Sequence, residues 1–276
     1  MSPALLTPPP KIAWIEPDTR VRTLALTSQF NASWGLSRIS HREANGHGTH
    51  CAGIIGSRSY GVAKKACLIG VKVLGADGSG SLSNIVAGIE WAVDDAREKG
   101  RIGRAVANLS FGGFYSRTGN AAVRAGLFVG VAAGNDGAPA FLTTPASEKT
   151  ACTVGASDIM DTRVPYSNFG SVVDIFAPGK NIISTWIGGP TRTNARSGTS
   201  MATPYIVGLA AYLMGLEGPK EPGLLCEQMR RMATKKKLSG TSRWFLSGLM
   251  GTPICWLIMI MVPRQAAFQV SQERGS

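Results

Sequence analysis

Short apolar runs and helix-like stretches alternate through the middle of the chain. Runs rich in β-branched and apolar residues, typical of buried strands, cover Leu68–Leu74, Ala105–Phe111, Leu127–Ala133, Thr150–Ala156 and Val172–Phe176. A helical pattern begins near Ser83, a good capping residue, and ends at Gly100; a shorter helix is predicted over Asn120–Ala125. Strands alternating with helices predict an α/β fold whose parallel sheet is covered on both faces. In such folds the functional side chains follow the carboxyl ends of the strands.

Two blocks fall outside this alternation. Residues 1–32 are Pro-rich and then mixed, and residues 217–276 show no clear rhythm. The opening residues lack a basic segment and a long apolar run, so we do not interpret them as a signal peptide. The longest late apolar run, Ile254–Val262, has nine residues, whereas a membrane-spanning helix needs about 20. We therefore expect no membrane segment.

Composition supports a globular protein and argues against some partners. The chain has 276 residues, 44% of them apolar and 17% charged, which excludes a disordered protein. Its net charge is +12, but residues 217–276 alone contribute +5, from nine basic and four acidic side chains. No nucleic-acid-binding motif accompanies this charge, so a solvated basic surface is the simpler interpretation. Five cysteines without a CxxC pair argue against a zinc site.

A cluster of His and Gly between Asn45 and Gly53 is the first candidate for chemistry. It reads Asn-Gly-His-Gly-Thr-His-Cys-Ala-Gly. Glycines on both sides of His47 let a ligand or another backbone approach closely, and an imidazole there can act as a general base near neutral pH. A surface turn or an incidental metal site are the alternatives for this motif.

Two further motifs fit the same chemistry. Ser200 lies in Ser-Gly-Thr-Ser-Met-Ala-Thr-Pro, at or just before a predicted helix whose first turn Pro204 suits. A helix N-terminus stabilises negative charge, which suits a nucleophile that generates an oxyanion; a plain helix cap is the alternative. Asn135 follows a strand and a glycine, where its amide can donate to such an oxyanion; a simple turn residue is the alternative.

Together the His, Asn and Ser motifs resemble those of the subtilase family of serine peptidases, and closely those of its proteinase K-like fungal members. They occur in the family's order, and the resemblance runs almost unbroken from Asn45 to Leu216. It implies a three-layer subtilisin-like α/β fold with a central, mostly parallel sheet. It also implies that Ser200 attacks the scissile carbonyl, that His47 transfers the proton, and that Asn135 and the Ser200 N–H hold the oxyanion.

The resemblance also implies roles for other residues. Those expected to bind substrate are Gly78, Ser79, Gly80, Ser110, Phe111 and Gly112, which pair with an extended peptide, and Ala132, Ala133 and Gly134, which form the wall of the specificity pocket. Asp174, with the backbone carbonyls of Lys149 and Ala151, is expected to hold a structural Ca²⁺. Cys152 and Cys226 are expected to form a disulfide, and Cys51 to be a buried thiol beside the catalytic His.

One essential part of the family pattern is missing. A Ser–His pair needs a carboxylate to orient the imidazole, and the family supplies it from an Asp-Thr/Ser-Gly motif on a strand before the His. The sequence between Asn31 and Asn45 resembles the mature start followed almost at once by the His motif, so this strand of the central sheet is expected to be absent. Asp18, followed by Thr and Arg, is a weak substitute, because its surroundings better resemble the end of the inhibitory propeptide.

These observations divide the chain into three parts: a propeptide remnant and linker (1–26), an incomplete peptidase domain (27–240) and a divergent tail (241–276). The favoured function is a secreted, monomeric serine endopeptidase that cuts extended polypeptides, needs no cofactor for chemistry and is inhibited by its propeptide. The missing Asp makes the activity of this chain the open question. A non-catalytic peptide-binding protein of the same fold is the alternative, and a basic nucleic-acid or membrane-surface binder is a third.

Overall fold

The computed structural model describes residues 16–23, 45–124, 126–235 and 237–240. At its centre lies a four-stranded parallel sheet of β3 (Val106–Leu109), β5 (Phe128–Ala132), β7 (Cys152–Ser157) and β8 (Ile175–Pro178), in that spatial order. Every residue of β5 and β7 is buried. Continuous burial is what strands covered on both faces require, so the parallel α/β fold predicted from the apolar runs is confirmed.

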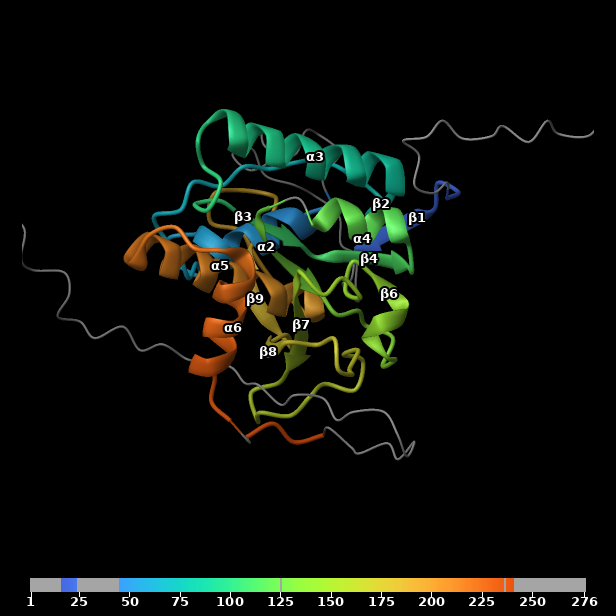
Figure 1. Ribbon diagram of the computed structural model, residues 1–276. Coiled ribbons are helices and arrows are strands. Elements are labelled where there is room, and N and C mark those ends of the chain that lie inside the picture. The colour runs from blue at the N-terminus through green and yellow to red at the C-terminus, as the bar shows by residue number, and fades with distance from the viewer. Residues whose placement is uncertain (1–15, 24–44, 125, 236, 241–276) are drawn as a thin grey trace, which may run out of the picture.

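Helices cover both faces of this sheet and complete the three layers (Figure 1). On one face lie α3 (Leu82–Glu98) and α4 (Arg117–Val123); on the other lie α2 (His47–Gly56), α5 (Thr199–Glu217) and α6 (Pro222–Met232). Successive residues of β5 point to opposite faces of the sheet. Val129 and Val131 join the core under α3, whereas Gly130 leaves room for Val207 of α5, which a Cβ at that position would approach to 2.4 Å.

The central helix α5 is long and apolar enough to cross a membrane by length and composition. However, 72% of its most apolar window is buried inside the protein, where it packs against β3, β5, β7 and β8. Its apolar character therefore reflects its position in the core. The apolar run Ile254–Val262 lies outside the described residues.

A second sheet is antiparallel throughout. Its order is β2 (Ser79–Ser81), β1 (Arg20–Thr23), β4 (Phe111–Phe114) and β6 (Thr143–Thr144). Strand β1 is central and runs antiparallel to both β2 and β4. The chain also forms a short helical turn, η1 (Ala140–Leu142), and the antiparallel pair β9 (Ile182–Thr185) and β10 (Thr193–Arg196).

Some predicted elements differ in extent. The predicted strand Ala105–Phe111 is two strands, β3 and β4, separated at Ser110. Helix α3 begins at Leu82 with Ser81 as its cap, so Ser83 is not the cap. Helix α4 begins at Arg117, before the predicted Asn120, because the Ser116 side chain accepts from the Gly119 N–H.

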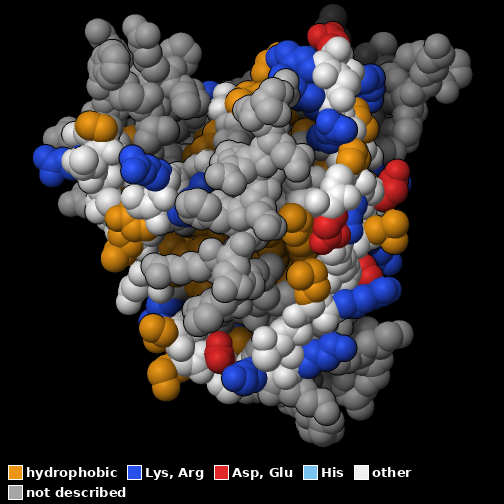
Figure 2. All heavy atoms as spheres, turned by 90° about the vertical axis from the view of Figure 1, so that its left-hand side faces the viewer, with side chains coloured by type: hydrophobic (Ala, Val, Ile, Leu, Met, Phe, Trp, Pro, Cys, Tyr) orange, Lys and Arg blue, Asp and Glu red, His pale blue; other side chains and the backbone are white. Residues whose placement is uncertain are grey.

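The largest difference is the segment Leu68–Leu74, which was predicted to be a strand and is not one. Its residues pair with no strand of the described chain, although Val73 packs under Gly88 of α3. An apolar segment forms a strand only where a neighbouring strand satisfies its backbone hydrogen bonds. Figure 2 shows one face of the molecule, where hydrophobic side chains lie among Lys and Arg.

Candidate active site

His47 is the first residue of α2, and a glycine makes this position possible. Gly46 has a φ of 81°, and a Cβ there would lie 2.5 Å from the Trp186 ring. The His47 N–H donates to Asn45 Oδ1 at 3.1 Å, which holds the first turn. The Gly-His-Gly pattern therefore places the imidazole where the helix leaves a tight left-handed turn.

The second histidine of the motif has a structural role. His50 is fully buried, and its Nε2 donates to the carbonyls of Ile182 (3.0 Å) and Asn194 (3.1 Å). These bonds fasten α2 to β9 and β10. Burial lowers the pKa of His50 to about 4, so this imidazole is neutral at physiological pH.

Ser200 is the second residue of α5, inside the first turn of the helix. Its Oγ donates to Ser110 O at 2.9 Å. Pro204, four residues on, lies in the second turn and has no N–H to donate to Ser200 O. Ser110 Oγ (3.0 Å) and Cys51 Sγ (3.4 Å) donate to this carbonyl instead. Because the proline leaves this carbonyl without a helical partner, the carbonyl can bind Ser110, between β3 and β4, and Cys51 of α2.

Cys51 joins the two candidate catalytic residues. Its Sγ donates to Ser200 O and lies 4.0 Å from His47 Nδ1. Burial raises the pKa of this thiol to about 12, so it stays protonated and acts as a packing group. His47 and Ser200 are therefore neighbours in the fold, although in this structure the Ser200 hydroxyl points to Ser110 O.

No carboxylate of the described chain contacts the His47 imidazole. His47 Nε2 is buried and has no hydrogen-bond partner within the described residues. Burial, with further contributions from nearby His50 and Arg196, lowers the pKa of His47 to about 3. Asp18 does not serve as this carboxylate here: its two oxygens accept from the Ser83 N–H (3.0 Å) and hydroxyl (2.7 Å).

The predicted oxyanion residue lies beside Ser200. Asn135 follows β5, and its Oδ1 accepts from the Thr199 N–H (2.9 Å) and hydroxyl (3.0 Å) at the start of α5. The Gly134 N–H also faces Thr199 Oγ1, at 3.3 Å. Asn135 is therefore held by its Oδ1 against the turn that carries Ser200.

The predicted pocket wall is supported by a residue that the sequence did not single out. Ala132 and Ala133 are fully buried, and Gly134 has a φ of 109°. Asn168 Nδ2 donates to Ala133 O at 3.0 Å, and a Cβ on Gly134 would lie 2.1 Å from the same nitrogen. Asn168 lies within the stretch from Asn45 to Leu216 that resembles the family, but only the fold brings it to this wall.

The two predicted substrate-binding segments flank β1. Arg20, Val21 and Arg22 pair with Ser81, Gly80 and Ser79, and Arg22 and Thr23 pair with Gly112 and Phe111. The Thr23 N–H donates to Gly78 O at 2.9 Å. Val21 is 5% exposed, in a small pocket with Leu82 and Phe111. These two edges therefore bind an extended backbone in the structure itself.

Two carboxylates fix the residues just before β1. Glu16 accepts from the Ser116 hydroxyl (2.7 Å) and from the N–H groups of Arg117 (2.8 Å) and Thr118 (3.0 Å), at the start of α4. Asp18 binds Ser83 at the start of α3. Hydrogen bonds lower the pKa of Glu16 to about 2, and the largest contribution comes from Ser116. Glu16 is therefore an anion at the N-terminus of α4, where the helix dipole favours negative charge.

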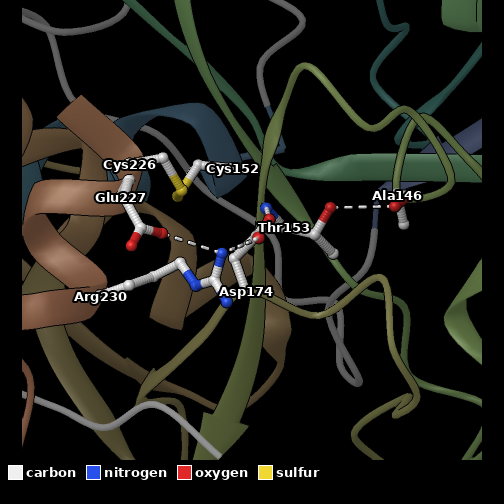
Figure 3. The surroundings of a disulfide bond; sticks show 7 residues. All are labelled: Ala146, Cys152, Thr153, Asp174, Cys226, Glu227 and Arg230. Carbon is white, nitrogen blue, oxygen red and sulfur yellow. Dashed lines mark hydrogen bonds and ion pairs between the residues drawn. A yellow bond between two sulfur atoms is a disulfide. The ribbon is translucent and has the colours of Figure 1, made fainter. Parts of the chain in front are cut away.

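A disulfide and a partly buried carboxylate lie at the start of β7 (Figure 3). Cys152 and Cys226 form the disulfide that links β7 to α6. Asp174 Oδ2 accepts from the Thr153 N–H at 2.8 Å, whereas Oδ1 lies 3.9 Å from Arg230 Nη1 and receives no hydrogen bond from the described residues. Burial raises the pKa of Asp174 to about 6. Lys149 and Ala151, the other two residues expected at the calcium site, lie just before β7.

Comparison with known proteins agrees with this arrangement. The profile of the subtilase family matches residues 16–244. The cuticle-degrading protease of Metarhizium anisopliae is 45% identical over 284 residues, covering 84% of this chain and 73% of that protein. Proteinase R of Parengyodontium album is 51% identical over 207 residues, covering 74% of this chain and 53% of that protein.

A solved structure is similar as well. A cold-adapted subtilisin-like serine proteinase superposes with a TM-score of 0.67 at 38% identity, covering 76% of this chain and 73% of that one. The family profile, the relatives and the fold agree with the resemblance carried by the three motifs. The chain belongs to the subtilase family of serine-type endopeptidases.

Proposed function

We propose that the protein hydrolyses peptide bonds of extended polypeptides through an acyl-enzyme on Ser200. The Ser200 hydroxyl turns from Ser110 O towards His47 and attacks the scissile carbonyl, while His47 accepts the hydroxyl proton. His47 then donates that proton to the leaving amine. Asn135 and the Ser200 N–H donate to the oxyanion that forms at the attacked carbonyl. Water completes the cycle by attacking the acyl-enzyme with His47 again as the base.

The observation that carries this proposal is the position of β1. It lies antiparallel between β2 and β4, as a polypeptide substrate would when added as a strand to both edges. Its last residue, Thr23, lines the same cavity as His47 and Ser110, and Ser110 hydrogen-bonds Ser200. The backbone therefore leads from the binding edges to the nucleophile. Backbone pairing makes little demand on side chains, which suits a broad choice of substrates.

Low activity is part of the proposal, because the triad carboxylate is missing. The alignment to the Metarhizium protein spans 284 positions, whereas 84% of this 276-residue chain is about 232 residues. About fifty positions of that relative thus have no counterpart here, which supports the loss of the strand that carries the Asp. Removal of this Asp from subtilisin lowers kcat by about 3 × 10⁴, and activity of that reduced order is expected.

We also propose that residues 16–23, which include β1, act as a built-in inhibitor. Glu16 and Asp18 anchor the segment to α4 and α3, and residues 20–23 fill the edges that substrate needs. This arrangement supports the assignment of residues 1–26 to a propeptide remnant. The protein is proposed to act as a monomer, and the Cys152–Cys226 disulfide supports an extracellular location, since disulfides persist in oxidising compartments.

A structural Ca²⁺ is proposed near Asp174. The donor chemistry fits a hard cation, because Asp174 Oδ1 receives no hydrogen bond from the described residues. Lys149 and Ala151 come just before Thr153, whose N–H binds the other Asp174 oxygen. Asp174, with the carbonyls of Lys149 and Ala151, would hold the ion. Bound there, calcium would neutralise the buried carboxylate and tie β8 to β7, without any part in the chemistry.

The proposed function is tested with the purified chain and its Ser200→Ala variant. Each is incubated with an unfolded, fluorescently labelled protein, and each is treated with a fluorophosphonate probe that labels activated serines. We expect slow hydrolysis and labelling by the wild-type chain and neither by the variant. Equal hydrolysis by both chains would refute the catalytic role of Ser200. A wild-type chain that binds peptides but neither cuts nor labels would instead establish the peptide-binding alternative.

A further inference from the structure

In the described part of the chain, β3 is the edge strand of the central sheet, beside the active site. Strand β3 pairs in parallel with β5 on one side, from Val106↔Phe128 to Leu109↔Val131. Within the described residues, no strand pairs with its other side. Three of its four residues are partly exposed, whereas β5 is entirely buried. Along this side, the backbone of β3 pairs with no strand among residues 16–23, 45–124, 126–235 and 237–240, as the edge of a sheet does.

The segment opposite this edge has the pattern of a strand that lacks a partner. Residues 68–74 are apolar and β-branched, yet they form no strand, and Ile69 and Val71 remain 52% and 39% exposed. A cavity of about 1770 Å³ is lined by this segment and by residues 105–111. Ile85 and Ile89 of α3 and Val207 of α5 line it as well, so both faces of an added strand would meet apolar side chains.

Two of the polar residues that line this cavity have a buried polar atom without a partner in the described chain. His47 and Asn108 both line the cavity, and His47 Nε2 and Asn108 Oδ1 are buried without a hydrogen-bond partner in the described chain. Ser110, which directly follows β3, hydrogen-bonds Ser200 O, and Cys51 joins that carbonyl to His47. The carboxyl end of β3 is therefore the end that meets the catalytic histidine.

We propose that this cavity binds an extended apolar peptide, supplied by another molecule, that adds to the sheet as a parallel strand beside β3 and carries, near its carboxyl end, an aspartate facing His47. Parallel addition follows from the direction of β3, β5, β7 and β8, and it brings the peptide's carboxyl end to His47. Burial on both faces selects a continuous run of Val and Ile. The aspartate supplies the anion that the buried imidazole lacks.

This inference rests on the proposed function only in its last step, the effect on catalysis. Binding is therefore measured separately from activity. The probe is a fluorescent peptide of two Lys, for solubility, then four Val, Asp and Gly. Its controls replace Asp by Asn, or the second Val by Pro, which removes a backbone donor and prevents a central strand. Anisotropy reports binding, thermal unfolding reports stabilisation, and a photoreactive version of the peptide reports the site.

We expect saturable binding and a higher Tm with the Asp and Asn peptides but not with the Pro peptide. Cross-links should fall on residues 68–74 and 105–108. The Asp peptide, and not the Asn peptide, should raise Ser200-dependent hydrolysis by tenfold or more. An Ala107→Trp variant, which narrows the cavity beside β3, should bind the peptide at least tenfold more weakly; its circular dichroism shows whether the fold is kept.

Three outcomes would overturn the proposal: no saturable binding, equal binding of the Pro peptide, or cross-links confined to Ser79–Ser81 and Phe111–Phe114, which belong to the substrate edges. A dimer in solution that excludes the peptide would place a second copy of the chain in the cavity and also overturn it. Binding with the expected cross-links but without hydrolysis would support the strand site while contradicting the catalytic function.

Discussion

At the scale of single residues, Asp174 offers a prediction with a definite sign. Burial raises the pKa of this carboxyl from its ordinary 3.8 to about 6, so the folded state holds the proton more tightly than the unfolded state. The stability that this preference contributes is present below about pH 4 and is lost as the pH rises through 6. In EDTA at pH 7, Asp174→Asn should therefore raise the free energy of unfolding by about 1–3 kcal/mol.

Denaturant unfolding at pH 4 and pH 7 checks this prediction, because the gain should vanish at pH 4. The exposed Asp94→Asn substitution is the control and should change little at either pH. Millimolar Ca²⁺ should stabilise the wild-type chain and not the Asp174→Asn variant. A variant that is less stable than wild type at pH 7 in EDTA would show that Arg230 and Thr153 already compensate the charge.

The residues of the site were accessible to sequence reasoning to different degrees. His47, Asn135 and Ser200 lie in compact motifs whose residue types follow from the chemistry, and the structure brings all three to one place. Asn168 and the carbonyl freed by Pro204 act through contacts with distant segments. No local pattern reports such contacts, so these supporting roles appear only once the fold is known.

At the scale of elements, the segment before β1 is held by two helix N-termini, and this leads to a prediction about its mobility. Glu16 and Asp18 accept hydrogen bonds from the first turns of α4 and α3. Gln and Asn at these positions keep an acceptor but lose the charge that the helix dipoles favour. In the Glu16→Gln, Asp18→Asn double variant, the amides of residues 20–23 should exchange hydrogen about tenfold faster at pH 7.

Hydrogen exchange followed by mass spectrometry on the 16–23 region measures this change, and Glu90→Gln on the exposed side of α3 is the matched control. The hydrogen bonds lower the pKa of both carboxyls, that of Glu16 to about 2. The stabilisation of the segment by the two ionised carboxylates is therefore complete above about pH 4 and is lost as the pH falls towards 2. Unchanged exchange in the double variant would mean that pairing with β2 and β4 alone retains the segment.

The elements themselves show where prediction from sequence succeeds. The apolar runs of β5 and β7 are buried on both faces, so their composition alone indicates strands. Residues 68–74 have the same composition but lack a partner, and a strand depends on its neighbours as well as on its own residues. The β1 strand is the opposite case. Arg20–Thr23 is mostly polar, yet it forms a strand because β2 and β4 pair with it on both sides.

At the scale of the whole molecule, a covalent link joins the parallel sheet to helix α6. The Cys152–Cys226 disulfide spans 74 residues and connects the first residue of β7 to α6. Closing a loop of that length restricts the unfolded chain by about 4 kcal/mol at 25 °C. The Cys152→Ser, Cys226→Ser double variant should lose stability of that order. Because a domain of this kind has only about 5–15 kcal/mol to lose, the effect should be large.

Thermal unfolding of the variant in oxidising buffer tests this, with Cys67→Ser, which replaces an exposed free thiol, as the matched control. We expect a substantially lower Tm for the double variant and little change for the control. The open edge of β3 makes the molecule more dependent on this link, since the sheet that the disulfide anchors lacks pairing on that side among the described residues. Adding the strand-forming peptide should therefore recover part of the lost Tm. If the double variant were as stable as the wild type, packing of α6 against α5 would suffice without the disulfide.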